Sequence, residues 1–250
     1  MPISVIIPTY SSPDALDLCL QSCIEGQTQK NQIIVIIDGF YDINKDVLEK
    51  WSTHIDVLNL EENVGLCRGT NLGVYNAQYD KILIINDDNV APMSYDKYLL
   101  EDYKENSVLC PNQIEPNPSI YKQFHIQNLG TDPKTFNLKD FWKYETNIME
   151  NKIDETGSTL PIFMSKIDYL RVGGWDENYP TSGMVADIDF FHKCLLSGMK
   201  MIRSYKTHFY HFASLSVNGS ERQETEKNAY EYAKYKWGRY FKRDQNNNVI

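Results

Sequence analysis

The sequence predicts an α/β fold with a mostly parallel central sheet flanked by helices. Short apolar runs rich in β-branched residues recur through the first half of the chain, as in strands buried on both faces of a sheet. Segments with apolar residues at helical spacing lie between these runs. Strands that alternate with helices imply right-handed crossovers and a parallel sheet, so ligands are expected at the carboxyl ends of the strands.

In the first half, each expected strand is an apolar run that ends in polar residues. Strands are expected at 3–7, 33–37, 57–60 and 82–85. A helix is expected to begin near the S-P-D sequence at 12–14 and to continue to 24, and further helices are expected over 47–51 and 69–78.

The expected strand ends carry Pro8, Thr9, Asp38, Asp87 and Asp88. Two adjacent carboxylates after a buried strand repel each other, so they either hold a cation or form a solvated turn rich in Asp and Asn. Because all five residues fall at the ligand edge of one sheet, the metal-binding interpretation is favoured over the turn.

The second half has a less regular pattern. Prolines interrupt the chain after Val108, and short strands and loops are expected there, with no clear period over 121–144. A strand is expected at 159–164, a helix at 167–172, a turn at 173–177, a helix at 187–196, a strand at 199–203, a C-terminal helix around 230–237 and a frayed tail at 244–248. Asp187 and Asp189 would open the helix at 187–196, where the helix dipole favours negative charge and where either residue alone also suits a helix cap.

Composition narrows the possible functions. The chain has 250 residues and a formal net charge of -9, which argues against nucleic acid as a main partner. Its five cysteines include no C-x-x-C pair and leave one unpaired, which favours reduced thiols. The sequence shows neither a signal peptide nor an apolar stretch long enough for a membrane span, so a cytoplasmic protein is expected.

Seven short motifs in order resemble those of the family 2 glycosyltransferases. They are V-I-I-P-T-Y at 5–10, I-D-G at 37–39, N-V-G-L-C-R-G-T-N-L-G at 63–73, N-D-D-N at 86–89, G-G-W-D-E at 173–177, A-D-I-D-F at 186–190 and K-W-G at 236–238. The resemblance implies a single domain with the GT-A fold, in which a Rossmann-like nucleotide-sugar-binding half (1–105) precedes an acceptor-binding and catalytic half (106–221). A C-terminal helix and tail (222–250) would follow.

The same resemblance implies roles for individual residues. Asp187 would be the catalytic base, and Asp88 with His211 would hold Mn²⁺ or Mg²⁺. Acceptor contacts would come from Trp175, Asp176 and Asp189. The residues expected to bind the nucleotide-sugar donor are Pro8, Thr9, Tyr10, Asp38, Asn63, Gly65, Arg68, Asn71 and Asp87.

The expected activity is a metal-dependent, inverting transfer of a sugar from a nucleotide-diphosphate sugar, with UDP favoured, to a hydroxyl of a glycan or other acceptor. The chain departs from the family pattern at Asn86 and Ala186, where the motifs usually carry acidic residues, and it has Asp38 alone before Gly39. A carbohydrate-binding module without turnover therefore stays open as an alternative. A nucleotidyltransferase is a second alternative, although the Gly-rich basic loop that its chemistry needs is missing between Ile7 and Asp14.

Overall fold

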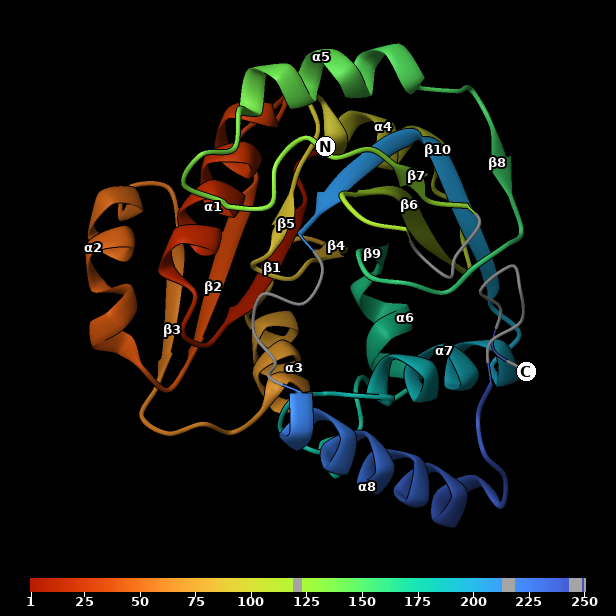
Figure 1. Ribbon diagram of the computed structural model, residues 1–250. Coiled ribbons are helices and arrows are strands. Elements are labelled where there is room, and N and C mark those ends of the chain that lie inside the picture. The colour runs from red at the N-terminus through yellow and green to blue at the C-terminus, as the bar shows by residue number, and fades with distance from the viewer. Residues whose placement is uncertain (119–122, 213–218, 243–248, 250) are drawn as a thin grey trace.

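The computed structural model describes residues 1–118, 123–212, 219–242 and 249 (Figure 1). Its sheet has the strand order β3-β2-β1-β4-β9-β6-β10-β5, with β7 paired to β6 and β8 to β10. The elements are β1 Ser4–Thr9, α1 Pro13–Gly26, β2 Gln32–Asp38, α2 Tyr41–Trp51, β3 Asp56–Leu60, α3 Leu66–Asn76, β4 Lys81–Ile84, β5 Asn89–Val90, α4 Tyr95–Asp102, β6 Ser107–Glu115, β7 His125–Ile126, α5 Leu138–Ile148, β8 Ile153–Asp154, β9 Ile162–Ser165, α6 Lys166–Arg171, α7 Ala186–Leu196, β10 Lys200–His211 and α8 Gly219–Trp237.

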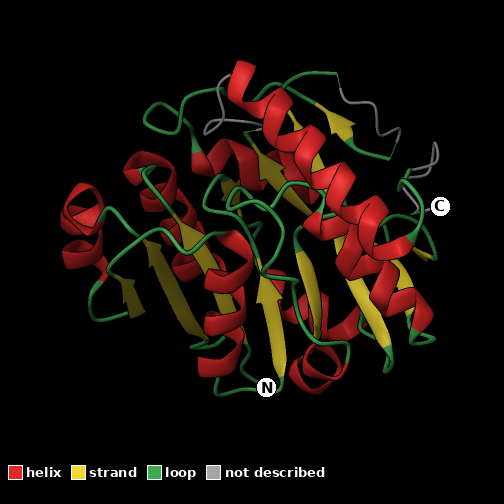
Figure 2. Ribbon diagram, turned by 90° about the horizontal axis from the view of Figure 1, so that it is seen from below, coloured by secondary structure: helices red, strands yellow, loops and turns green. Residues whose placement is uncertain are grey.

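Helices cover both faces of the sheet, as Figures 1 and 2 show. Along β1, Val5 and Ile7 join a buried cluster with residues of α1 and α4, whereas Ile6 joins the cluster that includes residues of α3, α6, α7 and α8. Successive side chains of a strand point to opposite faces, so a strand covered on both sides must be apolar throughout. This burial explains the uninterrupted apolar runs in the sequence.

The prediction of a mostly parallel first half is confirmed. β3, β2, β1 and β4 are parallel neighbours, and they lie within one or two residues of the expected strands. The antiparallel β9 joins this parallel part to β6 and β10, which are parallel to each other. The carboxyl ends of β1, β2 and β4 therefore meet at one edge of the sheet.

The expectation of short strands and loops in the proline-interrupted segment after Val108 is wrong in part, since in the described part of that segment only β7 is a short strand. β6 is a nine-residue strand within the sheet, and α5 follows it. Pro111 had argued against a strand, because proline cannot donate to a ladder hydrogen bond. Pro111 pairs with Ser204, and the next residue, Asn112, pairs with His208. The register of β6 and β10 is therefore irregular directly after Pro111. β10 is likewise longer than predicted, since it continues to His211.

Other expectations have mixed outcomes. All five cysteines are buried and none forms a disulfide, as predicted for reduced thiols, and Cys19 and Cys23 lie on the buried side of α1. The predicted frayed tail at 244–248 lies outside the described residues. Among the helices of the described ranges, none has both the length and the apolar character needed to cross a bilayer.

Candidate active site at the carboxyl edge of the sheet

The ends of β1 and β4 are joined by one short hydrogen bond. The Thr9 hydroxyl donates to Oδ2 of Asp87 at 2.6 Å. Burial and the adjacent Asp88 carboxylate raise the pKa of Asp87 to about 7, although the Thr9 hydroxyl partly offsets this. Two predicted donor-binding residues, 78 positions apart, therefore meet at the sheet edge. Pro8, also predicted there, lies buried within β1.

Asp38 ties the end of β2 to the start of α3. Its carboxylate accepts hydrogen bonds from the amides of Val64 at 2.6 Å and Gly65 at 3.0 Å, and Asn63 Oδ1 also accepts from Gly65. Burial raises the pKa of Asp38, and these backbone amides lower it in part. Gly65 has a φ of +91°, and a Cβ there would lie 2.9 Å from the Cα of Thr181. The close approach of the two segments thus requires glycine.

An exposed aromatic pair stands beside this edge. The residues Tyr10 and Phe40 are 42% and 48% exposed, and their rings pack edge to face with centroids 4.7 Å apart. The buried amide of Asn44 donates to the carbonyls of both residues, at 3.0 and 3.2 Å. Phe40 has a φ of 31°, which is uncommon for a residue other than glycine. Asn44 therefore holds the backbone beneath two aromatic side chains that remain available to solvent.

Asp88 and His211 lie together, as the resemblance implied. Nε2 of His211 is 3.6 Å from Oδ2 of Asp88, which is longer than a hydrogen bond, whereas Nδ1 is 3.0 Å from Oε1 of Glu115. Burial lowers the pKa of His211, but the Asp88 and Glu115 carboxylates outweigh it and raise the pKa to about 10. Oδ1 of Asp88 is buried and has no hydrogen-bond partner. A buried carboxylate oxygen without a donor is suited to a cation.

Asp187 lies in the first turn of α7, and the loop before α7 packs on the start of α3. The amide of Leu66 donates to the Thr181 carbonyl at 2.8 Å, and a Cβ on Gly183 would clash with the Leu66 side chain. Val185, at the helix N-cap, has a φ of +66°, a strained value for a β-branched residue. These contacts bring the catalytic half of the predicted division against the donor half.

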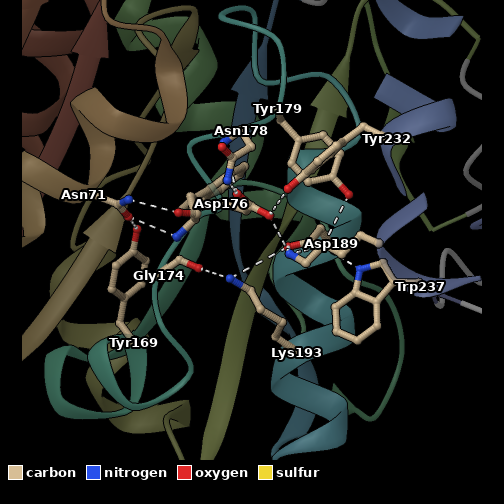
Figure 3. A network of polar contacts seen from close by, with 12 residues as sticks. Asn71, Tyr169, Gly174, Asp176, Asn178, Tyr179, Asp189, Lys193, Tyr232 and Trp237 are labelled. Atoms are coloured by element: carbon tan, nitrogen blue, oxygen red, sulfur yellow. Dashed lines mark hydrogen bonds and ion pairs between the residues drawn. The ribbon is translucent and has the colours of Figure 1, made fainter. Parts of the chain in front are cut away.

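Asp189 lies in an interior network of polar contacts (Figure 3). It is fully buried and accepts hydrogen bonds from Trp237 Nε1 at 2.7 Å and from Tyr179. Lys236 Nζ lies 2.8 Å from it, and Lys193 lies at 3.7 Å. Asp189 thus joins α7 to α8. It was predicted to contact the acceptor, but its oxygens are directed into this interior network.

Asn71, Trp175 and Asp176 are likewise engaged within the protein. The Asn71 amide donates to the Trp175 carbonyl and accepts from the Trp175 amide and the Tyr169 hydroxyl (Figure 3). Trp175 is 2% exposed and stacks on Phe190 at 5.7 Å. Asp176 accepts from Lys236 Nζ at 2.6 Å. These side chains hold the 173–177 turn between α3, α7 and α8.

A cavity of about 350 Å³ adjoins this turn. Arg68, which was predicted to bind the donor, is exposed near it and lies 4.0 Å from Glu177. The cavity is lined by Asn71, Tyr75, Tyr169, Leu170, Gly173, Gly174, Trp175, Asp176, Glu177, Lys193 and Lys236.

Sequence reasoning missed three residues at the edge. Glu115 belongs to no motif, and it ends a strand that was not predicted. Phe40 follows the I-D-G motif, and only its position next to a strand end could have indicated it. Asn44 lies inside α2, where its buried amide had no signal in the sequence.

The fold is that of an α/β protein with acidic residues gathered at the carboxyl ends of its strands. The chain belongs to glycosyl transferase family 2, whose sequence model matches residues 4–167. Its fold is the GT-A fold. The family and fold predicted from the seven motifs are confirmed.

Curated relatives include the poly-beta-1,6-N-acetyl-D-glucosamine synthases of Staphylococcus aureus (strain MSSA476) and Staphylococcus epidermidis. They are 25% and 26% identical over 126 residues, which is 50% of this chain and 30% of each relative. The chain therefore covers less than a third of the length of these relatives.

Two solved structures share the fold. S. aureus TarS has a TM-score of 0.62 at 16% identity, covering 94% of this chain and 40% of TarS. GalNAc-T7 with UDP, GalNAc and Mn2+ has a TM-score of 0.61 at 14% identity, covering 83% of this chain and 43% of that protein.

Proposed function

We propose that the chain is an inverting glycosyltransferase that moves a sugar from a nucleotide-diphosphate sugar to a hydroxyl of a glycan or other acceptor. Family membership and the acidic edge support this activity. The observation that carries the proposal is the hydrogen bond of 2.6 Å from the Thr9 hydroxyl, at the end of β1, to Oδ2 of Asp87, which follows β4. The next residue, Asp88, has a buried Oδ1 without a hydrogen-bond partner. In open α/β sheets, ligands bind outside the carboxyl ends of the strands, which is where these groups lie.

The donor nucleotide would lie against Tyr10 and Phe40. Each of these residues is nearly half exposed, and stacking on a base requires mainly an accessible aromatic face. Ile37, which stands where the family often has a second aspartate, is fully buried and offers no polar group. The GalNAc-T7 complex contains UDP, so UDP is the nucleotide to test first.

Asp88 and His211 would hold a divalent cation, Mn²⁺ or Mg²⁺. In the described residues, no three His, Cys, Asp or Glu side chains are placed to enclose a metal by themselves. Two protein groups fit a cation whose remaining ligands are diphosphate oxygens and water, as is common for Mg²⁺ in nucleotide sites. His211 must release its Nε2 proton to bind. Such a cation would stabilise the negative charge that develops on the diphosphate leaving group.

Asp187 would be the general base. Its carboxylate would take the proton of the acceptor hydroxyl as the hydroxyl oxygen bonds to the anomeric carbon and the bond from that carbon to the diphosphate breaks. A single displacement inverts the anomeric centre. Asp187 lies in the first turn of α7, and a general base accepts the proton as a carboxylate.

A nucleotide-sugar screen tests the proposal. Thermal unfolding of the protein would be followed with UDP-, CDP- and GDP-sugars, with and without Mn²⁺, and each stabilising donor would then be tested for UDP, CDP or GDP release. A ligand at 100 times its Kd stabilises by about 2.7 kcal/mol, which is readily measured. Donor binding with turnover that falls in Asp187→Asn supports the enzyme. Binding without transfer or hydrolysis would favour the carbohydrate-binding module, and no binding would contradict both.

A further inference from the structure

The structure assigns Glu115 a role that no motif indicates: we infer that Glu115 positions His211, so that the imidazole presents Nε2 to the cation at Asp88. The inference rests on the proposed function, because it concerns the same cation. It concerns orientation of a ligand, and Glu115 itself is not a ligand.

The two nitrogens of His211 have unequal contacts. Nδ1 is 3.0 Å from Oε1 of Glu115, which is a hydrogen-bond distance. Nε2 is 3.6 Å from Oδ2 of Asp88, so it points toward that carboxylate without a direct hydrogen bond. A proton held on Nδ1 by Glu115 leaves the lone pair of the neutral imidazole on Nε2, which is the nitrogen that faces Asp88.

The backbone on both sides of the imidazole is fixed. Glu115 ends β6, where it pairs with Ile126 of β7. His211 ends β10, where it pairs with Asn89 of β5, and the next amide, that of Phe212, donates to the Asp88 carbonyl at 3.2 Å. These backbone contacts therefore fix the main chain that carries all three side chains.

The burial of the three groups supports the same arrangement. The side chains of Asp88, Glu115 and His211 are 13%, 12% and 23% exposed, so they are largely shielded from water yet reachable. A simple ion pair would leave no reason for the buried, unpartnered Oδ1 of Asp88. A histidine that binds a metal commonly donates its other ring N–H to a carboxylate, and loss of that carboxylate costs about 10–100-fold in metal affinity.

A second histidine on β10 provides a matched control. His208 is fully buried, and its Nδ1 lies 3.6 Å from Oε1 of Glu145 on α5. Glu145 thus stands near a β10 histidine as Glu115 does, but His208 does not contact Asp88 in the described contacts. Burial raises the pKa of Glu145 to about 8, so glutamine closely matches its neutral form at pH 7.

The test measures Mn²⁺ and Mg²⁺ binding by calorimetry in the presence of UDP, for wild type, Glu115→Gln, Glu115→Ala and Glu145→Gln. Glu115→Ala should weaken Mn²⁺ binding by about 10–100-fold. Glu115→Gln should have a smaller effect, because its amide oxygen still accepts from Nδ1. Since imidazole suits Mn²⁺ better than Mg²⁺, the preference for Mn²⁺ should fall in the Glu115 variants, and Glu145→Gln should match wild type.

Other outcomes would overturn the inference in distinct ways. Equal loss of Mn²⁺ and Mg²⁺ affinity in both Glu115 variants would make Glu115 a direct ligand. Unchanged Mn²⁺ affinity in folded Glu115→Gln and Glu115→Ala would make its contact with His211 a structural ion pair. If wild type binds UDP but no cation, the metal in the proposed function fails together with this role. If wild type binds neither, the proposed donor site itself fails.

Discussion

Replacement of Asp189 by asparagine should destabilise the protein, because Asp189 is a buried junction between α7 and α8. Its carboxylate accepts from Trp237 at 2.7 Å and lies 2.8 Å from Lys236 Nζ. Hydrogen bonds to charged groups contribute about 1.5–3 kcal/mol each. Asparagine keeps one acceptor oxygen, but it places an amide donor among other donors. The loss of one such hydrogen bond, together with the loss of the negative charge that pairs with Lys236, should lower the free energy of unfolding by about 3 kcal/mol.

Urea unfolding at pH 7 measures this cost. For a chain of this size, about 3 kcal/mol corresponds to a fall in Tm of about 6–12 °C. Hydrogen exchange should also show less protection in α8, which Asp189 holds through Lys236 and Trp237. Glu155→Gln is the control: it removes an exposed ion pair with Lys200 and should change stability by less than about 0.5 kcal/mol. A loss below about 0.5 kcal/mol in Asp189→Asn, with α8 still protected, would refute the reasoning.

Three further predictions concern the catalytic base, the nucleotide site and acid stability. Asp187→Asn should keep donor affinity and stability but lower transfer by about 10²–10⁴, and unchanged transfer would remove Asp187 from the base role. Phe40→Ala should weaken UDP binding by about 1–3 kcal/mol in calorimetry, whereas Tyr75→Ala, at the far end of α3, should not; equal affinities would exclude stacking on Phe40. Burial raises the pKa of Asp176, but Lys236 and Asn178 outweigh this and lower it from 3.8 to about 2. The pKa of Asp176 is lower in the folded protein than in the unfolded chain, so its ionised carboxylate stabilises the fold above about pH 4, and this contribution is lost as pH falls toward about 2. Lys236→Met should flatten that loss in urea titrations, and an unchanged slope would assign it to other carboxylates.

The sequence predicted the strands that carry the donor side of the edge. β1, β2 and β4 are buried on both faces, so their apolar runs are continuous, and polar residues mark where each run ends. Thr9, Asp87 and Asp88 could therefore be assigned to one edge before the structure was known. The contact between Thr9 and Asp87 follows from the parallel pairing of β1 with β4.

The His211 side of the edge was less predictable. β6 contains Pro111, and its place at an irregular register cannot be deduced without its partner strand. Since β6 was not predicted, the position of Glu115 at its end was hidden as well. α5 was missed for another reason: the charged Glu145 occupies one of the three buried positions of the helix, with Leu138 and Phe141, and so interrupts the apolar stripe.

The spacing of Asp187 and Asp189 in the sequence indicates the relative directions of their side chains but not the residues that they contact. Two residues apart at a helix start, they point in different directions, so their spacing indicates that they do not both reach the same acceptor hydroxyl. Two of the partners of Asp189, Lys236 and Trp237, come from α8, 47 and 48 positions later. Such long-range contacts follow from tertiary packing and have no local signal.

A divalent cation at Asp88 and His211 is proposed to hold the donor diphosphate, and electron paramagnetic resonance of bound Mn²⁺ measures whether it does. With Mn²⁺ and UDP, wild type should show couplings to ³¹P of the diphosphate and to ¹⁴N of an imidazole. His211→Ala should lose the ¹⁴N coupling and keep the ³¹P coupling, and Asp88→Asn should weaken Mn²⁺ binding, while Glu155→Gln should match wild type. Mn²⁺ that binds Asp88→Asn as tightly as wild type, or that shows no imidazole coupling in wild type, would contradict the account.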